Sequence, residues 1–408
     1  MTDLLNPDDA LQQLLAHIPG PTPEQVPPEQ ATERTLAVDV TAPIDLPPFA
    51  NSSVDGYAVR SADTSTAGTT LEVVMDIPAG TPPDRTIEAG QAARIMTGAP
   101  VPDGADAIIP VEKTNGKWNH DADTALEPQV TLNDAVSAGA NIRPVGENIR
   151  KGQQVLSAAT MLRPQDIGML VSLGVAEVKV YRQPTVAIIS TGDELVPVGE
   201  PLSPGKIHDS NSYTIAALVE ANGGVAIRMP AAKDTLEDVR DLFHEALAQQ
   251  PDMLVSTAGV SVGQYDVVRT VLDELGEIGF WRVNVRPGKP LAFGNIQGKP
   301  FFGLPGNPVS AMVTFDIFVR PALRKLGGMP DDTQTHTAIT GEDMRSDGRR
   351  TYVRVRLEEK DGTIVATTTG TQSSGALMSM VLADGLLIIP EGQTHVPAGT
   401  ALPVRLLR

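Results

Sequence analysis

The sequence predicts a multidomain protein in which one α/β domain is combined with all-β parts. Three observations favour this class: apolar strand patterns alternate with helical ones over residues 180–326, short β-like runs fill 50–140, and short alternating strands occupy 327–408. Apolar strands that alternate with helices indicate a parallel sheet covered on both faces. We therefore predict a central doubly wound, mostly parallel sheet domain, a small inserted β subdomain and a C-terminal β-barrel.

The predicted domain boundaries follow these changes of pattern. Residues 1–49 and 141–179 form an N-terminal mixed α+β domain, into which the β subdomain 50–140 is inserted. The α/β domain spans 180–326 and the β-barrel domain spans 327–408. A chain of 408 residues fits this division at roughly 150 residues per domain.

Each element of the α/β domain has its own signal. Apolar, β-branched runs predict strands at 185–190, 225–229, 252–259, 280–285, 291–294 and 299–306. Helical spacing predicts helices at 211–223, 234–249, 265–276 and 308–327. Asp234 or Thr235 is placed to cap the second of these helices. Outside this domain, the same spacing predicts helices at 4–18 and 162–175.

Composition excludes several classes of protein. The chain has 32 basic and 50 acidic residues, a formal net charge of −18, which argues against a general nucleic-acid or anionic-membrane surface. It has no cysteine, which excludes disulfides, thiolate metal sites and a cysteine nucleophile. No apolar stretch approaches 18 residues and the start lacks a signal-peptide pattern, so we expect a cytoplasmic protein with no membrane or nucleic-acid partner.

The loops that follow the predicted strands are the expected place for a ligand, because open parallel sheets bind ligands beyond the carboxyl ends of their strands. These loops are 190–195, 232–234, 256–266, 285–290 and 303–308. Most of them combine glycine or other small residues with a charged group. Backbone N–H groups at such glycines can approach an anion closely.

Charged residues of both signs fall in or beside these loops. The acids are Glu194, Asp234 and Asp266, and the cations are Arg282, Arg286 and Lys289. Each acid alone is more typical of a turn or a helix cap, but together with the cations the acids suggest Mg²⁺ bridging to a phosphate ester. The loop AGVSVG lacks the Gly-Lys-Ser/Thr ending of a nucleotide-triphosphate loop, so a phosphorylated or nucleotidyl small molecule is favoured as substrate.

A set of ordered motifs carries a family resemblance over residues 30–400. The motifs are NSSVDGYAV, TGAPVPDGADAIIPVE, VGENIRKG, STGDEL, KIHDSN, AGVSVGQYD, RPGKP, GLPGNPVSA, GRRTYVRV and SSGALMSM. Together they resemble the molybdopterin molybdenumtransferases, the MoeA family, which includes the gephyrin E domain. The α/β domain alone is similar to the standalone MoaB/Mog-like adenylyltransferases of the same pathway.

The resemblance implies a homodimeric enzyme of molybdenum cofactor biosynthesis. It would take adenylylated molybdopterin and molybdate, hydrolyse the adenylyl link with Mg²⁺ and release AMP. The active site would form between the α/β domain of one subunit and parts of its neighbour, and a molybdopterin adenylyltransferase would be the pathway neighbour. Two other functions stay open: adenylylation of molybdopterin with ATP, and a non-catalytic scaffold like gephyrin.

The resemblance also implies roles for individual residues. Catalytic roles fall on Asp55, Glu194, Asp234 and Asp266, of which Glu194 and Asp234 are the metal ligands. Substrate-binding roles fall on Thr97, Ser261, Arg282, Arg286, Gly306 and Asn307. Molybdate-binding roles fall on Lys289, Pro290, Ser310, Arg354 and Ser374. The chain departs from the family pattern at Asn148, at Ala258, at the pair Ser373-Ser374, and in having Arg282 and Arg286 where many members have lysine.

Overall fold

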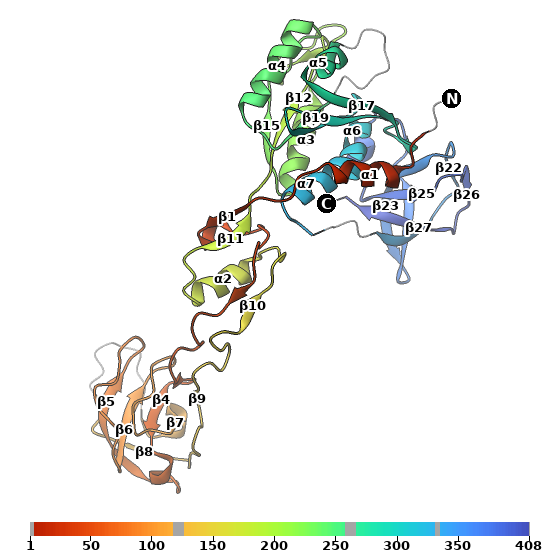
Figure 1. Ribbon diagram of the computed structural model, residues 1–408. Coiled ribbons are helices and arrows are strands. Elements are labelled where there is room, and N and C mark those ends of the chain that lie inside the picture. Colours follow the sequence, from red (N-terminus) through yellow and green to blue (C-terminus); the bar gives the residue numbers. More distant parts are fainter. Residues whose placement is uncertain (1–3, 117–125, 258–266, 331–334, 408) are drawn as a thin grey trace. The chain divides into compact units, whose positions relative to one another are not determined.

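The computed structural model describes residues 4–116, 126–257, 267–330 and 335–407 (Figure 1). The chain divides into two compact units. The first unit contains residues 1–38, 158–163 and 177–408, and the second contains 39–157 and 164–176. None of the described helices is long and apolar enough to cross a lipid bilayer.

A six-stranded sheet forms the centre of the first unit. Its strands, in spatial order, are β15 (Val225–Arg228), β12 (Thr185–Ile189), β16 (Met253–Ser256), β20 (Lys299–Gly303), β19 (Pro290–Ile296) and β17 (Gly276–Arg282). The first four strands are parallel, whereas β19 runs antiparallel to both of its neighbours. The predicted mostly parallel sheet is therefore confirmed.

Helices cover both faces of this sheet, as its apolar strands require (Figure 1). Val186 and Ile188 of β12 pack on one face, while Ala187 and Ile189 pack on the other. The first face is covered by α1 (Pro7–Ala16), α3 (Ser210–Ala221), α6 (Pro308–Thr314) and α7 (Arg320–Leu326). The second face is covered by α4 (Leu236–Ala248) and α5 (Val267–Leu275).

Two helix signals behave as elementary chemistry dictates. Thr235, rather than Asp234, caps α4: its hydroxyl accepts a hydrogen bond from the Asp238 N–H at 3.1 Å. The predicted long helix at 308–327 is interrupted by a π-helical turn, Phe315–Val319, between α6 and α7. Pro321 has no N–H for the carbonyl four residues earlier and crowds it, which explains a wider turn just before it.

The strand predicted at 280–285 differs from the structure. The strand β17 starts at Gly276 and leaves the sheet after Arg282, because the next backbone groups bond elsewhere. The Val283 N–H donates to the Lys289 carbonyl and the Asn284 N–H donates to the Leu5 carbonyl, each at 2.8 Å. Val285–Arg286 then forms β18, which pairs in parallel with the barrel strand β23.

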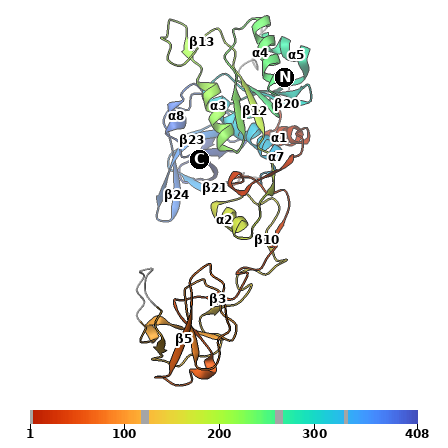
Figure 2. The same cartoon turned by 90° about the vertical axis from the view of Figure 1, so that its left-hand side faces the viewer.

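The C-terminal part of the first unit is a closed β-barrel, as predicted (Figure 2). Its ring consists of β23 (Arg350–Lys360), β24 (Thr363–Thr368), β21 (His336–Thr340), β27 (Ala401–Leu406) and β25 (Gly385–Ile389). The pairing of β23 with β25 closes the ring. Short elements complete the first unit: β1 (Pro23–Val26), η1 (Pro28–Gln30), β11 (Val178–Tyr181), β13 (Leu195–Val196), β14 (Ile207–His208), β22 (Met344–Arg345), α8 (Met378–Val381) and β26 (His395–Val396).

The second unit contains the predicted β subdomain. Its five-stranded sheet has the order β7 (Ala107–Pro110), β4 (Gly56–Val59), β6 (Gln91–Ile95), β5 (Thr70–Ile77) and β8 (Gln129–Thr131). Its other elements are β2 (Val40–Thr41), β3 (Asn51–Ser52), η2 (Ser61–Asp63), η3 (Val111–Lys113), β9 (Ile142–Arg143), β10 (Gln154–Leu156) and α2 (Pro164–Ser172). The central strand β4 is buried along its whole length, so its residues belong to the core on both faces.

Candidate active site

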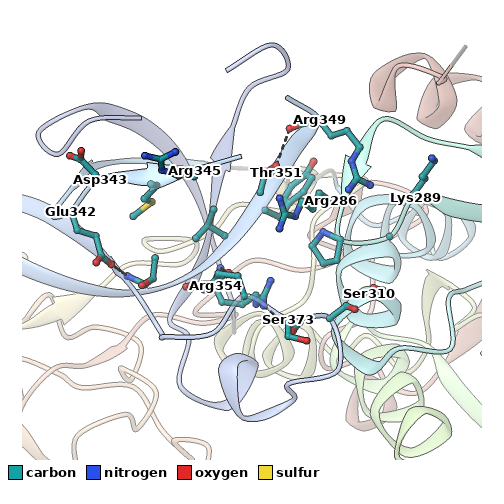
Figure 3. A pocket seen from close by; sticks show the side chains of 18 residues that line it. Arg286, Lys289, Ser310, Glu342, Asp343, Arg345, Arg349, Thr351, Arg354 and Ser373 are labelled. Carbon is teal, nitrogen blue, oxygen red and sulfur yellow. Dashed lines mark hydrogen bonds between the residues drawn. The ribbon is translucent and has the colours of Figure 1, made fainter. Parts of the chain in front are cut away.

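A pocket of about 520 Å³ lies in the first unit, where the loop at 286–289, the helix α6 and the barrel strand β23 meet (Figure 3). Its lining is rich in cations: Arg286, Lys289, Arg345, Arg349 and Arg354. Glu342 and Asp343 are the acidic side chains among the lining residues. We call this space the basic pocket. Its excess of positive charge suits a small anion, although the whole chain is acidic.

The loop at 286–289 owes its shape to glycine. The Arg286–Pro287 peptide bond is cis, and Gly288 has a φ angle of 105°, a region that favours glycine. A Cβ atom at Gly288 would collide with the Thr314 hydroxyl oxygen of α6. Glycine thus lets the loop lie against α6, and Lys289 and Ser310 line the same pocket.

Arg354 occupies the buried wall of the basic pocket. It lies on β23 with 1% of its surface exposed, donates from Nε to the Ser379 hydroxyl at 3.2 Å and from Nη2 to the Ser373 carbonyl at 3.1 Å. It pairs with no carboxylate among the residues that the structure describes. Burial, aided by the charge of Arg286, lowers the pKa of Arg354 to about 10.

Arg286 is held at the pocket by a chain of charged contacts. Its Nη1 atom lies 3.7 Å from Asp347 Oδ2. Arg349 Nη2 lies 2.5 Å from the same Asp347 Oδ2 atom, and Arg349 Nη1 donates to the Val285 carbonyl at 2.9 Å. These hydrogen bonds from Arg349 hold the pKa of Asp347 below its ordinary value. Asp347 and Arg349 therefore tie the barrel to the residue before Arg286.

Two serine-bearing segments complete the basic pocket. Ser310 lies on the first turn of α6 and is 4% exposed. Ser373 and Ser374 line the pocket from the segment before α8. The Val309 N–H donates to the Ser374 carbonyl at 3.1 Å, so this segment is fixed to the start of α6. Hydroxyl groups at these positions can donate hydrogen bonds to an oxyanion.

A second pocket, of about 280 Å³, lies at the carboxyl ends of the parallel strands. Glu194, Thr257 and Gly306 line it, and Gly306 accepts a hydrogen bond from the Asn211 side chain at 2.7 Å. Pro308 and Gly375 line it as well, next to residues that line the basic pocket. Of the predicted residues, Arg286, Lys289, Ser310, Arg354 and Ser374 line the basic pocket, and Glu194 and Gly306 line the second pocket.

The predicted acids lie on neighbouring loops. The Gly192 N–H donates to the Ala232 carbonyl at 3.1 Å, and the Asp234 N–H donates to Asp193 Oδ1 at 3.3 Å. Glu194 and Asp234 are both exposed. Within the described ranges no three His, Asp or Glu side chains form a metal site. Two carboxylates still fit Mg²⁺, which commonly binds one or two of them together with substrate oxygens.

Other predicted residues lie elsewhere or outside the described ranges. Asp266 and Ser261 fall outside the residues that the structure describes. Arg282, the last residue of β17, and Pro290, the first of β19, are register partners, and Arg282 is exposed. Asn307 precedes α6 and is exposed.

Asp55 and Thr97 belong to the second unit and contact each other. Asp55 Oδ1 accepts hydrogen bonds from the Thr97 N–H at 2.7 Å and from the Thr97 hydroxyl at 2.8 Å. The structure therefore joins these two predicted residues in one polar contact.

Sequence reasoning missed Arg345, Arg349, Asp347 and Gln372. A signal was available, because residues 345–356 contain five arginines in a strongly acidic chain. The spacing could not tell which of them reach the pocket. Arg345, Arg349 and Arg354 do, whereas Arg356 is exposed further along β23.

Comparison with known proteins agrees with this architecture over most of the chain. The model of the MoeA N-terminal region (domain I and II) matches residues 5–174. The model of a probable molybdopterin binding domain matches 187–325, and that of the MoeA C-terminal region (domain IV) matches 337–407.

Individual relatives match nearly end to end. Molybdopterin molybdenumtransferase 2 of Mycobacterium tuberculosis is 38% identical over 394 residues, which cover 94% of each chain. The molybdopterin molybdenumtransferase of Haemophilus influenzae is 36% identical over 406 residues, which cover 98% of each chain. The crystal structure of the molybdopterin biosynthesis MoeA protein from Pyrococcus horikosii superposes with a TM-score of 0.81 at 33% identity, covering 99% of each chain. On this sequence and architecture, the chain belongs to the MoeA family of molybdopterin molybdenumtransferases.

Proposed function

We propose that this chain transfers molybdenum from molybdate to molybdopterin in molybdenum cofactor biosynthesis, and that the basic pocket holds the molybdate. The names of its relatives supply the metal and the pterin. The observation that carries the proposal is the buried Arg354 guanidinium, which has no carboxylate partner among the described residues. Burying an uncompensated charge is costly, and a bound dianion would offset that cost.

The basic pocket offers a donor set that suits a small tetrahedral dianion. Arg354 and Arg286 contribute guanidinium forks, Lys289 contributes a compact ammonium, and Ser310 and Ser374 contribute hydroxyls. Arg349 and Asp347 act as positioning residues, because they bind the backbone before Arg286 and the Arg286 side chain itself.

The second pocket is our proposed site for the adenylyl part of adenylylated molybdopterin. Release of AMP requires that the phosphorus–oxygen bond between the adenylyl group and molybdopterin is broken. An oxygen from water or molybdate must attack the phosphorus, and the negative charge on the phosphate must be stabilised. Glu194 and Asp234 would position that oxygen together with Asp266, and they would hold Mg²⁺ with substrate oxygens. When bound, Mg²⁺ would supply positive charge opposite the phosphate.

The proposal includes a homodimer, with a cytoplasmic molybdopterin adenylyltransferase as the supplier of substrate. In this homodimer, Asp55 of one copy would act together with the basic pocket of the other copy. Mixing two impaired variants, Asp55→Asn and Arg354→Met, at a molybdate concentration that is limiting for Arg354→Met tests this arrangement. Partial recovery of activity in exchanged dimers is the expected result, and no recovery after verified subunit exchange would contradict a shared site.

The proposed activity is tested by mixing the purified protein with adenylylated molybdopterin and titrating molybdate against tungstate, while AMP is measured. We expect AMP release to depend on the oxyanion and to fall at least about tenfold in Lys289→Ala, because a charged hydrogen bond to the dianion is lost. Lys360→Ala is the control, since Lys360 is exposed and pairs with Glu358 at 2.7 Å. Oxyanion-independent AMP release would contradict the proposal, and pterin adenylylation from ATP would favour the adenylyltransferase alternative.

A further inference from the structure

Gln372 lines the basic pocket but has no role in the reaction proposed above. It lies between β24 and α8, directly before the pair Ser373-Ser374. Two hydrogen bonds join its side chain to the backbone of Arg354: Oε1 accepts from the Arg354 N–H at 3.0 Å, and Nε2 donates to the Arg354 carbonyl at 3.1 Å. Because both ends of the carboxamide are bound to one residue, Gln372 acts on that residue rather than on a ligand.

This contact continues the barrel sheet beyond the end of β24. The pairing of β23 with β24 reaches only to Val355, whose register partner is Thr368. The N–H and C=O groups of Arg354 both point to the side on which β24 has ended. The Thr369 N–H still donates to the Arg354 carbonyl at 3.1 Å, whereas the Arg354 N–H donates to Gln372. A carboxamide offers the donor and the acceptor of a peptide group, so Gln372 takes the place of the missing strand residue.

Burial makes the contact a requirement for Arg354. Arg354 is 1% exposed, so its backbone groups are shielded from water. Without Gln372, the Arg354 N–H would be a buried donor that has lost its acceptor, which is costly. The strand could reduce that cost only by shifting towards water or towards another acceptor. The guanidinium would then shift with the strand.

The segment that carries Gln372 also holds the guanidinium of Arg354. The Nε atom donates to the Ser379 hydroxyl at 3.2 Å, and Nη2 donates to the Ser373 carbonyl at 3.1 Å. The Thr369 hydroxyl donates to the Ser379 carbonyl at 3.0 Å, which joins the two ends of the segment 369–379. The guanidinium is therefore placed by this segment and by its own backbone, and Gln372 binds the one to the other.

We propose that Gln372 is a positioning residue for anion binding: it fixes the backbone of Arg354, and through it the place of the guanidinium in the wall of the basic pocket. This inference rests on the proposed binding of molybdate in that pocket. The chemistry of the contact suits an amide. A glutamate would lose the Nε2 donor and bring a negative charge towards the anion, and a lysine would have no acceptor for the Arg354 N–H.

The first test is Gln372→Met, which removes both hydrogen bonds, keeps a side chain of similar length and adds no charge. We expect the dissociation constant for molybdate, measured by calorimetry on the full-length protein, to rise at least about threefold. Gln393→Met is the control, because Gln393 is an exposed glutamine of the same barrel. An unchanged affinity in Gln372→Met overturns this inference alone if the wild-type protein binds molybdate. A wild-type protein that does not bind molybdate overturns the proposed function as well.

A double-mutant cycle separates positioning of Arg354 from a general role in the barrel. If Gln372 acts through Arg354, then Gln372→Met has no further effect on molybdate affinity in the Arg354→Met background. In the Lys289→Ala background we expect the loss to persist, because Lys289 reaches the pocket from a different loop. A loss of equal size in the Arg354→Met background would overturn the inference.

A measurement on the wild-type protein covers the case in which Gln372→Met does not fold. Bound molybdate would restrain Arg354, so hydrogen exchange at the Arg354 amide is expected to slow at least about threefold in a residue-resolved experiment. The Leu357 amide is the control. It also donates to a side-chain oxygen, Asp384 Oδ2 at 2.9 Å, and lies further along the same strand. Exchange at Arg354 that is unchanged by molybdate overturns the inference.

Discussion

Arg354 occupies an environment that folding alone would not favour. It is 1% exposed and its hydrogen-bond partners are a hydroxyl and a carbonyl, both uncharged. Replacing a buried charge by an apolar side chain of similar volume is often neutral or stabilising. The retained arginine is therefore better explained by binding than by stability.

Arg354→Met is expected to separate these two properties. The dissociation constant for molybdate rises at least about tenfold, because one or two charged hydrogen bonds are lost. The free energy of unfolding falls by less than about 1 kcal/mol, or rises. Calorimetric titration and denaturant unfolding measure the two quantities. Arg356→Met is the control on the same strand, because Arg356 is exposed. A large loss of stability with unchanged affinity would show that Arg354 is structural.

The lowered pKa of Arg354 gives a pH dependence. In the proposed site the guanidinium would bind the oxyanion in its protonated form, and its pKa in the free protein is about 10. Molybdate affinity is therefore constant below pH 10 and falls about tenfold per pH unit above it, because protonation and binding are linked. The affinity is measured in the Lys289→Arg variant. Arginine keeps a cation at position 289, and it does not lose its proton in the pH range in which a lysine does. Circular dichroism verifies the fold up to pH 11, and a flat profile to that pH would refute the effect.

At the scale of elements, the loop at 286–289 depends on contacts from three directions. Gly288 lies against α6, the Val283 N–H closes the loop on the Lys289 carbonyl, and Arg349 binds the Val285 carbonyl from the barrel. A loop that is fixed on several sides holds its side chains in more accurate positions than a free loop does. Binding of a small anion requires such accurate positions.

Gly288→Ala is expected to disrupt this loop. A methyl group at a φ of 105° is strained by about 1–2 kcal/mol and also meets the Thr314 hydroxyl, so molybdate affinity falls at least tenfold. Gly298→Ala is the matched control: its φ is 84°, but its Cβ would point into open space. It carries the same kind of backbone strain and leaves the affinity unchanged. Thr314→Ala in the Gly288→Ala background restores part of the affinity if the contact with α6 is the cause.

How far the sequence predicted each element depended on how local its signal was. The strand Thr185–Ile189 and the cap at Thr235 came from residues that lie next to one another in the chain. The strand after α5 was placed about four residues too late, because Gly276 starts it by pairing with Ile296 across the sheet. Likewise, Arg349 joins the basic pocket through a contact with Val285, 64 residues away, which no local pattern reports. The resemblance, and not residue spacing, singled out Arg354 among its neighbouring arginines.

At the scale of the whole molecule, the proposed functional residues are divided between two compact units. Asp55 and Thr97 belong to the second unit, whereas the basic pocket is built within the first. Compact units with separate cores commonly unfold in separate transitions. Substitutions at Asp55 can therefore be assigned to one unit by calorimetry.

The pair Asp55→Asn and Asp55→Ala distinguishes a role in chemistry from a role in structure. Asparagine keeps an oxygen that accepts both Thr97 hydrogen bonds but has no charge, whereas alanine loses both bonds at a cost of about 1–3 kcal/mol. We expect both variants to lower AMP release at least about tenfold, while Asp55→Ala alone lowers the melting temperature of the second unit. Wild-type activity in Asp55→Asn would leave Asp55 with a structural role alone.

The pairing of β18 with β23 also determines when the basic pocket can form during synthesis of the chain. Chains emerge from the ribosome N-terminus first, and domains fold as units. A nascent chain that ends before Arg350 can contain every strand of the central sheet, yet Val285 and Arg286 have no partner strand to join. Arg354 itself has not been made. The proposed anion site therefore arises only when translation has passed β23, and a chain interrupted before that strand would bury the central sheet without the buried arginine of the basic pocket.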